Sequence, residues 1–283
     1  HLSVSHSAIS LGLGLGGGKS ATSSGAPGGG TPFANTKSVT FDGVDDYGVS
    51  IPGILPHTTN YSGSFWFKVP SLPSSGYVGL FANQNGAMFY LYASGNILVS
   101  RATGSYWGLG GHKYINGLVS ADTWCHFAWT KERNSDGVGG WNNPTMSYYF
   151  NGGSQGSLTN RSDASGVLFD PDVGGETGLF WVGAGYNHGL NAACLMDEFA
   201  LWDTLLSAAQ ITNIYRGEES GGSGGTNGKA GDLKTFNPRN WYRMGDGTEA
   251  GSGTTVYDMG ASAGTTTDMT LTNGPAYSTD VPS

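Results

Sequence analysis

The chain has 283 residues, of which 49 are glycine, and aromatic and charged residues each contribute 12%. This composition favours many strands joined by tight turns and argues against a helical bundle. The formal net charge is -8, and the 13 Lys and Arg residues are scattered singly, so no basic stripe could follow a nucleic-acid backbone. No run approaches the roughly 20 apolar residues of a membrane-spanning helix. The sequence therefore predicts neither nucleic-acid binding nor membrane insertion.

Residues 1–35 form a glycine-rich arm and linker in which aliphatic side chains alternate with serine or glycine. The aliphatic positions are Ile9, Leu11, Leu13 and Leu15. If this stretch is extended, one face is apolar and the other is nearly bare backbone. An apolar face of this kind is better docked on a sheet edge or groove than left in water. We therefore predict that the arm is an assembly element that binds a neighbouring subunit.

From Ser38 to Trp202, at least eight runs alternate polar and apolar residues by twos and are separated by Gly, Asn, Asp and Pro. Strands at this density predict an all-β fold, a two-sheet antiparallel sandwich with jelly-roll connections. Cys125 and Cys194 each lie inside such a run. One disulfide and two buried thiols both suit these positions.

A single short helix is predicted after the strands, because Ser207 with Gln210 forms a capping box and apolar residues follow at helical spacing. The helix is expected to end at Gly217. Residues 218–229 are predicted from their composition to be a Gly/Ser linker. Residues 230–283 are predicted to be a small C-terminal β segment.

Four strings between residues 38 and 217 resemble, in the same order, the laminin-G-like, concanavalin A-like jelly-roll family found in bacterial surface and bacteriophage virion proteins. They are FDGVDDY at 41–47, SFWFK at 64–68, WCHFAWT at 124–130, and the closing strand and helix from Met196 to Gly217. The resemblance implies a jelly-roll domain over residues 36–217. It implies a fold and leaves the ligand open.

The C-terminal segment departs from the family order. Trp241-Tyr242 and the string GSGTTVYD at 251–258 are similar to sequences that often begin such domains, so the chain resembles a circular permutation. Residues 230–283 would then supply missing edge strands to their own sandwich or to a neighbour's, because an uncovered edge is a template for pairing. Alternatively, they begin a second, truncated repeat.

Catalytic patterns are missing from the sequence. The family 16 glycoside hydrolases share this sandwich, and their E-x-D-x-x-E strand has no counterpart here. Asp197 and Glu198 are adjacent, and neighbours on a regular strand point to opposite faces, so they are not expected to flank one glycosidic bond. His126 stands where the family usually has histidine, which implies a hydrogen-bonded packing role. The prediction is therefore no enzyme and no catalytic residue.

Calcium is the one ion that the sequence supports. Asp42, Asp45 and Asp46 crowd one turn, and Asp197 lies on a strand that related domains bring nearby. Hard cations need several oxygen ligands of this kind. The alternative is that Asp42 and Asp45 bond the backbone of a tight turn. Calcium is thus a candidate ligand, and no cofactor is required.

Glycan binding on such a sandwich would use aromatic rings for stacking and polar side chains for the hydroxyl groups. Residues with this chemistry in predicted loops are Tyr106, Trp107, Trp141, Asn142, Asn143, Tyr186, Asn187 and His188. Trp107 and Trp141 are equally compatible with a place in the core or in a subunit contact.

Together these features predict a non-enzymatic structural protein of a virion or cell surface, such as a phage capsid decoration, fibre or appendage, with a glycan-facing lectin-like domain. Its expected partners are further copies of itself, other virion or surface proteins, and glycans that would serve host adhesion. A free extracellular carbohydrate-binding module is the first alternative. A polysaccharide-degrading enzyme with unfamiliar catalytic residues is the second.

Overall fold

The computed structural model describes residues 33–51, 60–83, 87–101, 113–115, 118–132, 145–159, 179–263 and 267–283. The predicted arm lies outside the described residues, with Ile9, Leu11, Leu13 and Leu15. So do five of the glycan-binding candidates, Tyr106, Trp107, Trp141, Asn142 and Asn143.

The chain divides into two units, His1–Pro32 and Phe33–Ser283. The boundary predicted after residue 35 thus falls after Pro32. The reason is a set of contacts that residues 33–35 make with the second unit, including a hydrogen bond from Asn35 Nδ2 to Asp197 Oδ2 at 2.9 Å.

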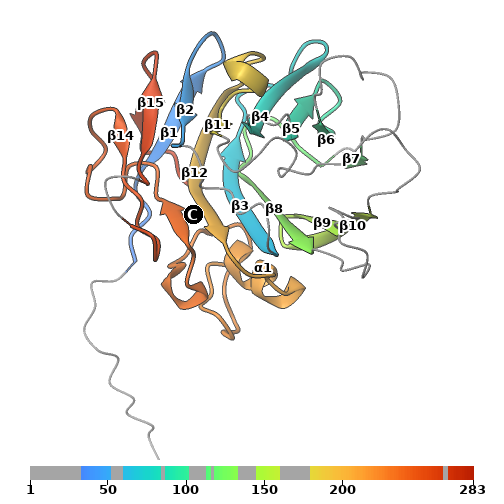
Figure 1. Cartoon of the computed structure of the whole chain (residues 1–283), viewed down its shortest axis with the longest axis vertical. Helices are drawn as coiled ribbons and strands as arrows, with labels where there is room; N and C mark the ends of the chain where they lie inside the picture. Colours follow the sequence, from blue (N-terminus) through green and yellow to red (C-terminus); the bar gives the residue numbers. More distant parts are fainter. Residues whose placement is uncertain are drawn as a thin grey trace, which may run out of the picture. The chain divides into compact units, whose positions relative to one another are not determined.

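Phe33–Ser283 holds two eight-stranded sheets (Figure 1). Sheet A has the order β10 (Gly153–Thr159), β9 (Thr145–Phe150), β8 (Cys125–Glu132), β3 (Tyr61–Lys68), β12 (Ala193–Trp202), β1 (Ser38–Asp42) and β16 (Ala276–Ser278), and β13 (Asn240–Tyr242) also pairs with β12. Sheet B has the order β14 (Thr255–Val256), β15 (Met269–Thr272), β2 (Tyr47–Val49), β11 (Phe180–Val182), β4 (Tyr77–Asn83), β5 (Ala87–Tyr92), β6 (Ile97–Arg101) and β7 (Lys113–Ile115). Neighbouring strands pair antiparallel, which confirms the predicted sandwich.

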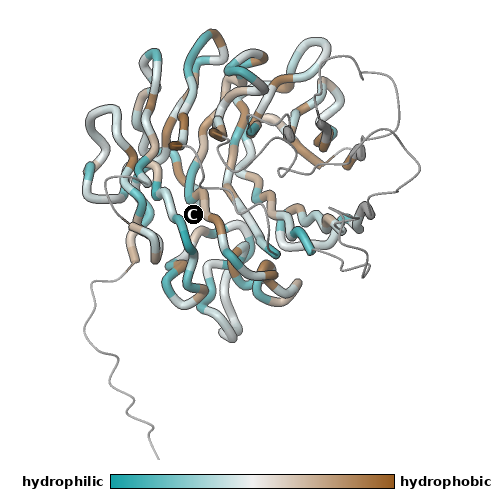
Figure 2. The backbone as a smooth tube through the Cα atoms, viewed as in Figure 1, coloured by the Kyte–Doolittle hydropathy of each residue, from teal (hydrophilic) through white to brown (hydrophobic). Residues whose placement is uncertain are grey.

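The core between the sheets is rich in aromatic rings, and hydrophobic segments follow its strands (Figure 2). The ring centroid of Phe65 on β3 lies 6.0 Å from that of Phe199 on β12 and 6.4 Å from that of Phe89 on β5. Phe65 therefore contacts rings of both sheets. Each fully buried side chain of this size contributes roughly 1.5–3 kcal/mol. The apolar side chains that the alternating pattern directs between the sheets are therefore the main source of the stability of the sandwich.

Cys125 and Cys194 are both buried free thiols. Burial raises the pKa of Cys125 to about 11 and that of Cys194 to about 12. The two side chains act as small apolar groups of the core.

The predicted helix is α1 (Ala208–Tyr215). Ser207 Oγ accepts a hydrogen bond from Gln210 N at 3.2 Å, and Gln210 Oε1 accepts one from Ser207 N at 2.9 Å, as the capping box requires. Ile211 and Ile214 pack on the outer face of sheet A. Among the described residues, no helix has the length and apolar character needed to cross a bilayer.

Residues 218–229, predicted from composition to be a Gly/Ser linker, make hydrogen bonds beside α1. Gly225 N donates to Glu218 Oε1 at 2.6 Å, and Gly228 N donates to the carbonyl of Tyr215 at 3.1 Å. A Cβ at Gly225 would lie 2.3 Å from Glu218. Glycine is needed here for close packing beside α1.

The C-terminal segment completes both sheets of its own sandwich. The β16 strand pairs with β1, β15 pairs with β2, and β13 pairs with β12. Without them, β1 and β2 would each lose a neighbouring strand. These strands thus pair within the same chain, and residues 230–283 are part of the unit that begins at Phe33.

Candidate functional site

An aromatic surface lies on the outer face of sheet B. The 3-10 turn η1 (Tyr186–His188) contains the glycan-binding candidates Tyr186, Asn187 and His188, and Asn187 and His188 are exposed. The His188 ring stacks on Tyr47 of β2 with centroids 5.0 Å apart and planes 12° apart. Trp181 of β11 meets the same imidazole edge-on at 6.4 Å.

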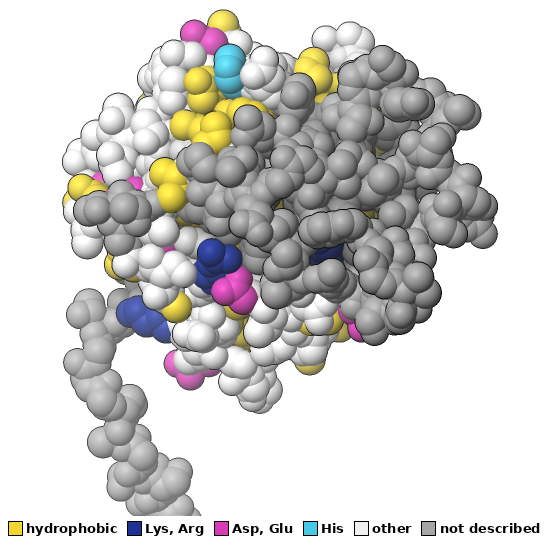
Figure 3. Space-filling view, viewed as in Figure 1, with side chains coloured by type: hydrophobic (Ala, Val, Ile, Leu, Met, Phe, Trp, Pro, Cys, Tyr) yellow, Lys and Arg dark blue, Asp and Glu magenta, His cyan; other side chains and the backbone are white. Residues whose placement is uncertain are grey.

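This surface continues across neighbouring strands as an apolar layer. Its members are Ala82, Tyr90, Leu98, Trp181 and Ala184, with Tyr47, Val49, Tyr77 and Leu179 partly buried against them. Hydrophobic side chains, a histidine and acidic side chains gather at the end of the molecule near β2 (Figure 3). We call Tyr47, Trp181 and His188 the aromatic platform.

Sequence reasoning found one of the platform's three residues. Tyr47 ends the FDGVDDY string and Trp181 lies in an apolar run, and neither was among the predicted glycan-binding residues. No local signal in the sequence showed which way Tyr47 faces, and the contacts of Gly48 in the structure show it. Because Gly48 faces Val182, Met269 and Leu271 in the core, its neighbour Tyr47 must face outward.

The acidic turn before Tyr47 is held by its own carboxylates. Asp42 Oδ1 accepts hydrogen bonds from Val44 N at 2.7 Å and Asp45 N at 3.4 Å, and Asp46 Oδ2 accepts one from Asp42 N at 3.0 Å. One carboxylate oxygen from each of Asp42, Asp45 and Asp46 lies within 4.8 Å of the others. Burial and the nearby Asp42 and Asp45 charges raise the pKa of Asp46, against the lowering effect of its hydrogen bond with Asp42. The turn thus satisfies part of its oxygen set through the backbone, and the same oxygens suit a hard cation.

Asp197 does not belong to that acidic turn, contrary to the prediction. The register pairs Asp42 with Ala193 and Val39 with Met196, so Asp197 lies beyond the other end of the pairing. At about 3.3 Å per residue, roughly 13 Å of strand separates the two carboxyl-bearing residues. Asp197 instead accepts hydrogen bonds from Asn35 Nδ2 and, at 2.8 Å, from Glu198 N.

Asp197 and Glu198 do not point to opposite faces either, because β12 has a bulge between them and Ala200. Glu198 has φ 48°, in the left-handed region, and the core-facing residues of β12 jump from Met196 to Phe199. The extra residue breaks the alternation by twos. Both carboxylates therefore leave the core and lie on the outer side of sheet A.

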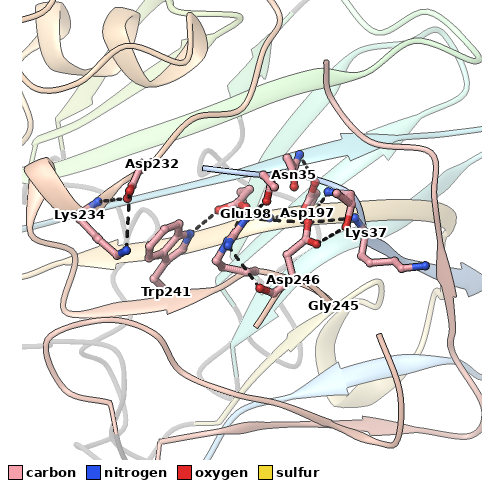
Figure 4. Close-up of polar contacts among 12 residues, drawn as sticks. Asn35, Lys37, Asp197, Glu198, Asp232, Lys234, Trp241, Gly245 and Asp246 are labelled. Atoms are coloured by element: carbon pink, nitrogen blue, oxygen red, sulfur yellow. Dashed lines mark hydrogen bonds and ion pairs between the residues drawn. The ribbon is translucent and has the colours of Figure 1, made fainter. Parts of the chain in front are cut away.

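A buried charged network surrounds this acid pair (Figure 4). Glu198 accepts a hydrogen bond from Arg243 Nε at 3.2 Å and a short one from Trp241 Nε1. Arg243 Nη2 lies 3.9 Å from the Asp246 carboxylate, and its guanidinium lies 5.3 Å from the Trp241 ring centroid. Arg243 thus serves two carboxylates, Glu198 and Asp246, and Asp197 lies beside them with no cation of its own, so full ionisation of the three acids would leave two uncompensated negative charges.

The pKa values of both acids are raised in this network. Burial and the neighbouring Glu198 raise the pKa of Asp197 well above its usual range. Burial raises the pKa of Glu198 to about 7, although Arg243 and the Trp241 hydrogen bond lower it. Because Glu198 has a cation beside it and Asp197 has none, we assign the proton retained at neutral pH to Asp197.

His126 has the packing role that the family resemblance implied. Its ring lies 5.0 Å from Trp66 and 6.2 Å from Tyr215, and burial lowers its pKa to about 3, so the imidazole is neutral. The implied hydrogen bond is absent, since neither ring nitrogen has a partner within the part of the chain that the structure describes.

The Arg243→Ala variant is expected to lose about 3–5 kcal/mol of unfolding free energy, because it leaves buried carboxylates without a cation. Urea denaturation at neutral pH measures this. Arg239→Ala is the matched control: Arg239 pairs with Asp203 near the surface, and its loss should cost less than about 1 kcal/mol. Equal losses in the two variants would contradict this account of the network.

Removal of calcium with a chelator is expected to change the melting midpoint by less than about 2 °C, because the carboxylates of the acidic turn bond their own backbone. A calcium site filled at 100 times its Kd would instead add about 2.7 kcal/mol to the free energy of unfolding and would shift the midpoint further. Melting with a chelator and with added calcium measures this. Asp45→Asn should reproduce the wild-type midpoint. A large calcium-dependent rise that this variant abolishes would show that the ion belongs to the folded state.

Several solved structures match this chain in part, among them three proteins from different organisms. A protein from Bacteroides ovatus that is provisionally assigned as carbohydrate-binding has a TM-score of 0.56 and 17% identity, and the match covers 89% of this chain and 62% of that chain. The heptameric SAP-like pentraxin of Limulus polyphemus has a TM-score of 0.42 and 16% identity, covering 64% and 82% of the two chains. Domain 4 of an extracellular arabinanase from Geobacillus stearothermophilus, solved with arabinotriose, has a TM-score of 0.40 and 18% identity, covering 59% and 71%.

The sequence comparisons identify the family. No curated protein sequence matches this chain significantly. Residues 42–212 match the Laminin_G_3 family model, described as the concanavalin A-like lectin/glucanases superfamily, which confirms the resemblance seen in the sequence. With this match over more than half of its length, the chain belongs to the laminin-G family of the concanavalin A-like lectin/glucanase superfamily.

Proposed function

We propose that this protein is a non-enzymatic carbohydrate-binding protein whose glycan contacts the aromatic platform. The observation that carries the proposal is the stack of His188 on Tyr47, with His188 and its neighbour Asn187 exposed. Flat rings offer an apolar surface to the C–H face of a sugar, and an adjacent amide can bind hydroxyl groups.

Two further features support glycan binding. The first is membership of a superfamily that includes lectins. The second is the similarity of fold to the Bacteroides ovatus protein provisionally assigned as carbohydrate-binding, of whose length this chain spans 62%. Asn191, whose side chain donates to the Asp46 carbonyl at 3.1 Å, ties the acidic turn to the strand that follows η1 and so steadies the platform.

The state of the acid pair supports a role without catalysis. Asp197 and Glu198 are buried, and both oxygens of each carboxylate accept hydrogen bonds from protein groups. A general acid or nucleophile must reach its substrate. We therefore place these residues in the framework of the protein. A polysaccharide-degrading enzyme remains the second alternative.

The proposed setting is a virion or cell surface, where the protein would assemble with further copies and with other surface proteins. The glycine-rich arm of residues 1–35 supports this, since alternating aliphatic residues suit docking on a sheet edge. A free extracellular carbohydrate-binding module is the alternative without assembly.

Glycan binding is tested on an array of bacterial and algal polysaccharide fragments, followed by calorimetric titration of the best ligand. His188→Ala and Tyr47→Ala should each weaken binding about tenfold or more, or about 1.4 kcal/mol. Tyr257→Ala is the control, because Tyr257 is 37% exposed and lies outside the apolar layer of sheet B. If none of these variants changes the affinity, the glycan binds elsewhere on the protein. If reducing ends are released from the polysaccharides, the alternative of a polysaccharide-degrading enzyme is supported.

Deletion of residues 1–32 is expected to leave a folded sandwich, because the contacts of Phe33 and Asn35 remain. The truncated chain should melt within about 2 °C of the full chain and should lose its self-association or its incorporation into the native particle. Light scattering and particle reconstitution measure both. Normal assembly without the arm would favour the free binding module.

A further inference from the structure

Residues 33–37, which immediately precede β1, are fastened to the turn after β13 by one carboxylate. Asp246 Oδ2 accepts hydrogen bonds from Thr36 N at 2.5 Å and Lys37 N at 2.9 Å, and Asp246 Oδ1 accepts one from Thr36 Oγ1 at 2.5 Å. We call residues 33–37 the lead-in segment. Its attachment depends on side chains, since it belongs to no strand.

The same segment covers the buried charges. The Phe33 ring stacks on Trp241 with centroids 6.5 Å apart, and the Arg243 guanidinium lies 4.5 Å from the Phe33 centroid. Arg243 Nη2 donates to the Ala34 carbonyl at 2.5 Å. Asn35 Nδ2 donates to Asp197. The lead-in segment therefore covers the acid pair, and the guanidinium lies beside both rings.

In the described part of the chain, few cations near the lead-in segment can balance the negative charges of Asp197 and Glu198. From β13 and its turn come Arg243, Asp246 and Glu249, and Glu249 Oε1 is engaged by Gly245 N at 3.0 Å. The lead-in segment itself carries Lys37, whose backbone N–H binds Asp246.

The neighbouring strand β3 carries Lys68 beside Leu195 of β12. Lys68 is engaged by Asp122 at 2.9 Å and by Asp280 at 2.7 Å, so its charge is already balanced. Further away, the η2 turn (Lys234–Phe236) holds Lys234 close to Asp232. Arg243 is thus the one cation whose bonds reach the acid pair among the described residues.

We propose that the lead-in segment is a proton-dependent latch, closed over Asp197 and Glu198 in acidic and neutral solution and opened by alkaline solution. Opening would let water reach the two carboxylates without disturbing the core, because Met196 and Phe199, on either side of the pair, face the opposite side of sheet A.

Proton linkage gives the direction of the pH effect on the latch. The closed state raises the pKa of both acids through burial, so the closed state binds protons more tightly than an open, hydrated state. Closure is fully favoured below the ordinary carboxyl range. It weakens as the pH rises toward and beyond about 7, where Glu198 and then Asp197 lose their protons in the closed state.

Hydrogen exchange of the Thr36 and Lys37 amides in the full chain tests the latch between pH 5 and pH 9. Rates are expressed as protection factors, so that the intrinsic pH dependence of exchange cancels. The two amides should lose at least about tenfold in protection across this range, since one pKa unit between the closed and open states corresponds to a factor of ten. Amides of β3 serve as the internal reference and should keep their protection.

Variants separate the acid pair from the attachment itself. Asp197→Asn and Glu198→Gln should each reduce the fall in protection with pH, because each removes one of the two titrating acids. Asp246→Ala removes the acceptor of the Thr36 and Lys37 amides, so it should lower their protection at every pH while the fall remains. If Asp197→Asn does not fold, Glu198→Gln and the wild-type titration still decide the question. Constant protection in the wild type, a fall shared equally with β3, or an unchanged fall in both acid-pair variants would overturn the proposal.

Discussion

The bulge at Glu198 in β12 is the constraint on which much of the structure depends. This strand pairs with β3, β1 and β13, so it must fit the core on one side and the covering segments on the other. A regular strand would direct one of the two acids toward the aromatic core, where an unpaired charge is very costly. The extra residue keeps Phe199 in the core and sends both acids outward. The left-handed backbone of Glu198, which costs about 1–3 kcal/mol, is the consequence.

Aromatic rings have two different roles on the two sides of sheet B. Inside, Phe81, Phe89 and Phe180 pack against rings of sheet A and stabilise the fold. Outside, Trp181 is buried in a second apolar cluster with Tyr47 partly buried against it, and the exposed His188 stacks on Tyr47. Rings that are already stacked on the outer face of a sheet would lose little conformational entropy on contact with a ligand.

The C-terminal strands join regions that are far apart in the sequence. The β16 strand closes the edge beside β1, while Asp280 beyond it accepts hydrogen bonds from Lys68 and, at 2.8 Å, from Trp124. Since β13 also supplies Arg243 and Trp241 to the buried network, the segment after residue 230 both completes the sheets and builds the site beneath the lead-in segment. The family model, which covers residues 42–212, leaves these strands out.

The sequence by itself determined the fold class, the helix and the family. Alternation by twos in runs such as SFWFK and the capping box at Ser207 and Gln210 are local signals, and local backbone geometry is enough to interpret them. Only the tertiary structure decided where the acids lie. A bulge is set by the partner strand and shifts every later side chain by one face, so adjacency of Asp197 and Glu198 could not reveal their common side. The same holds for Tyr47 and for the lead-in segment, whose surroundings come from β11, β13 and η1, because contacts between residues so distant in the chain depend on how the sheets pair.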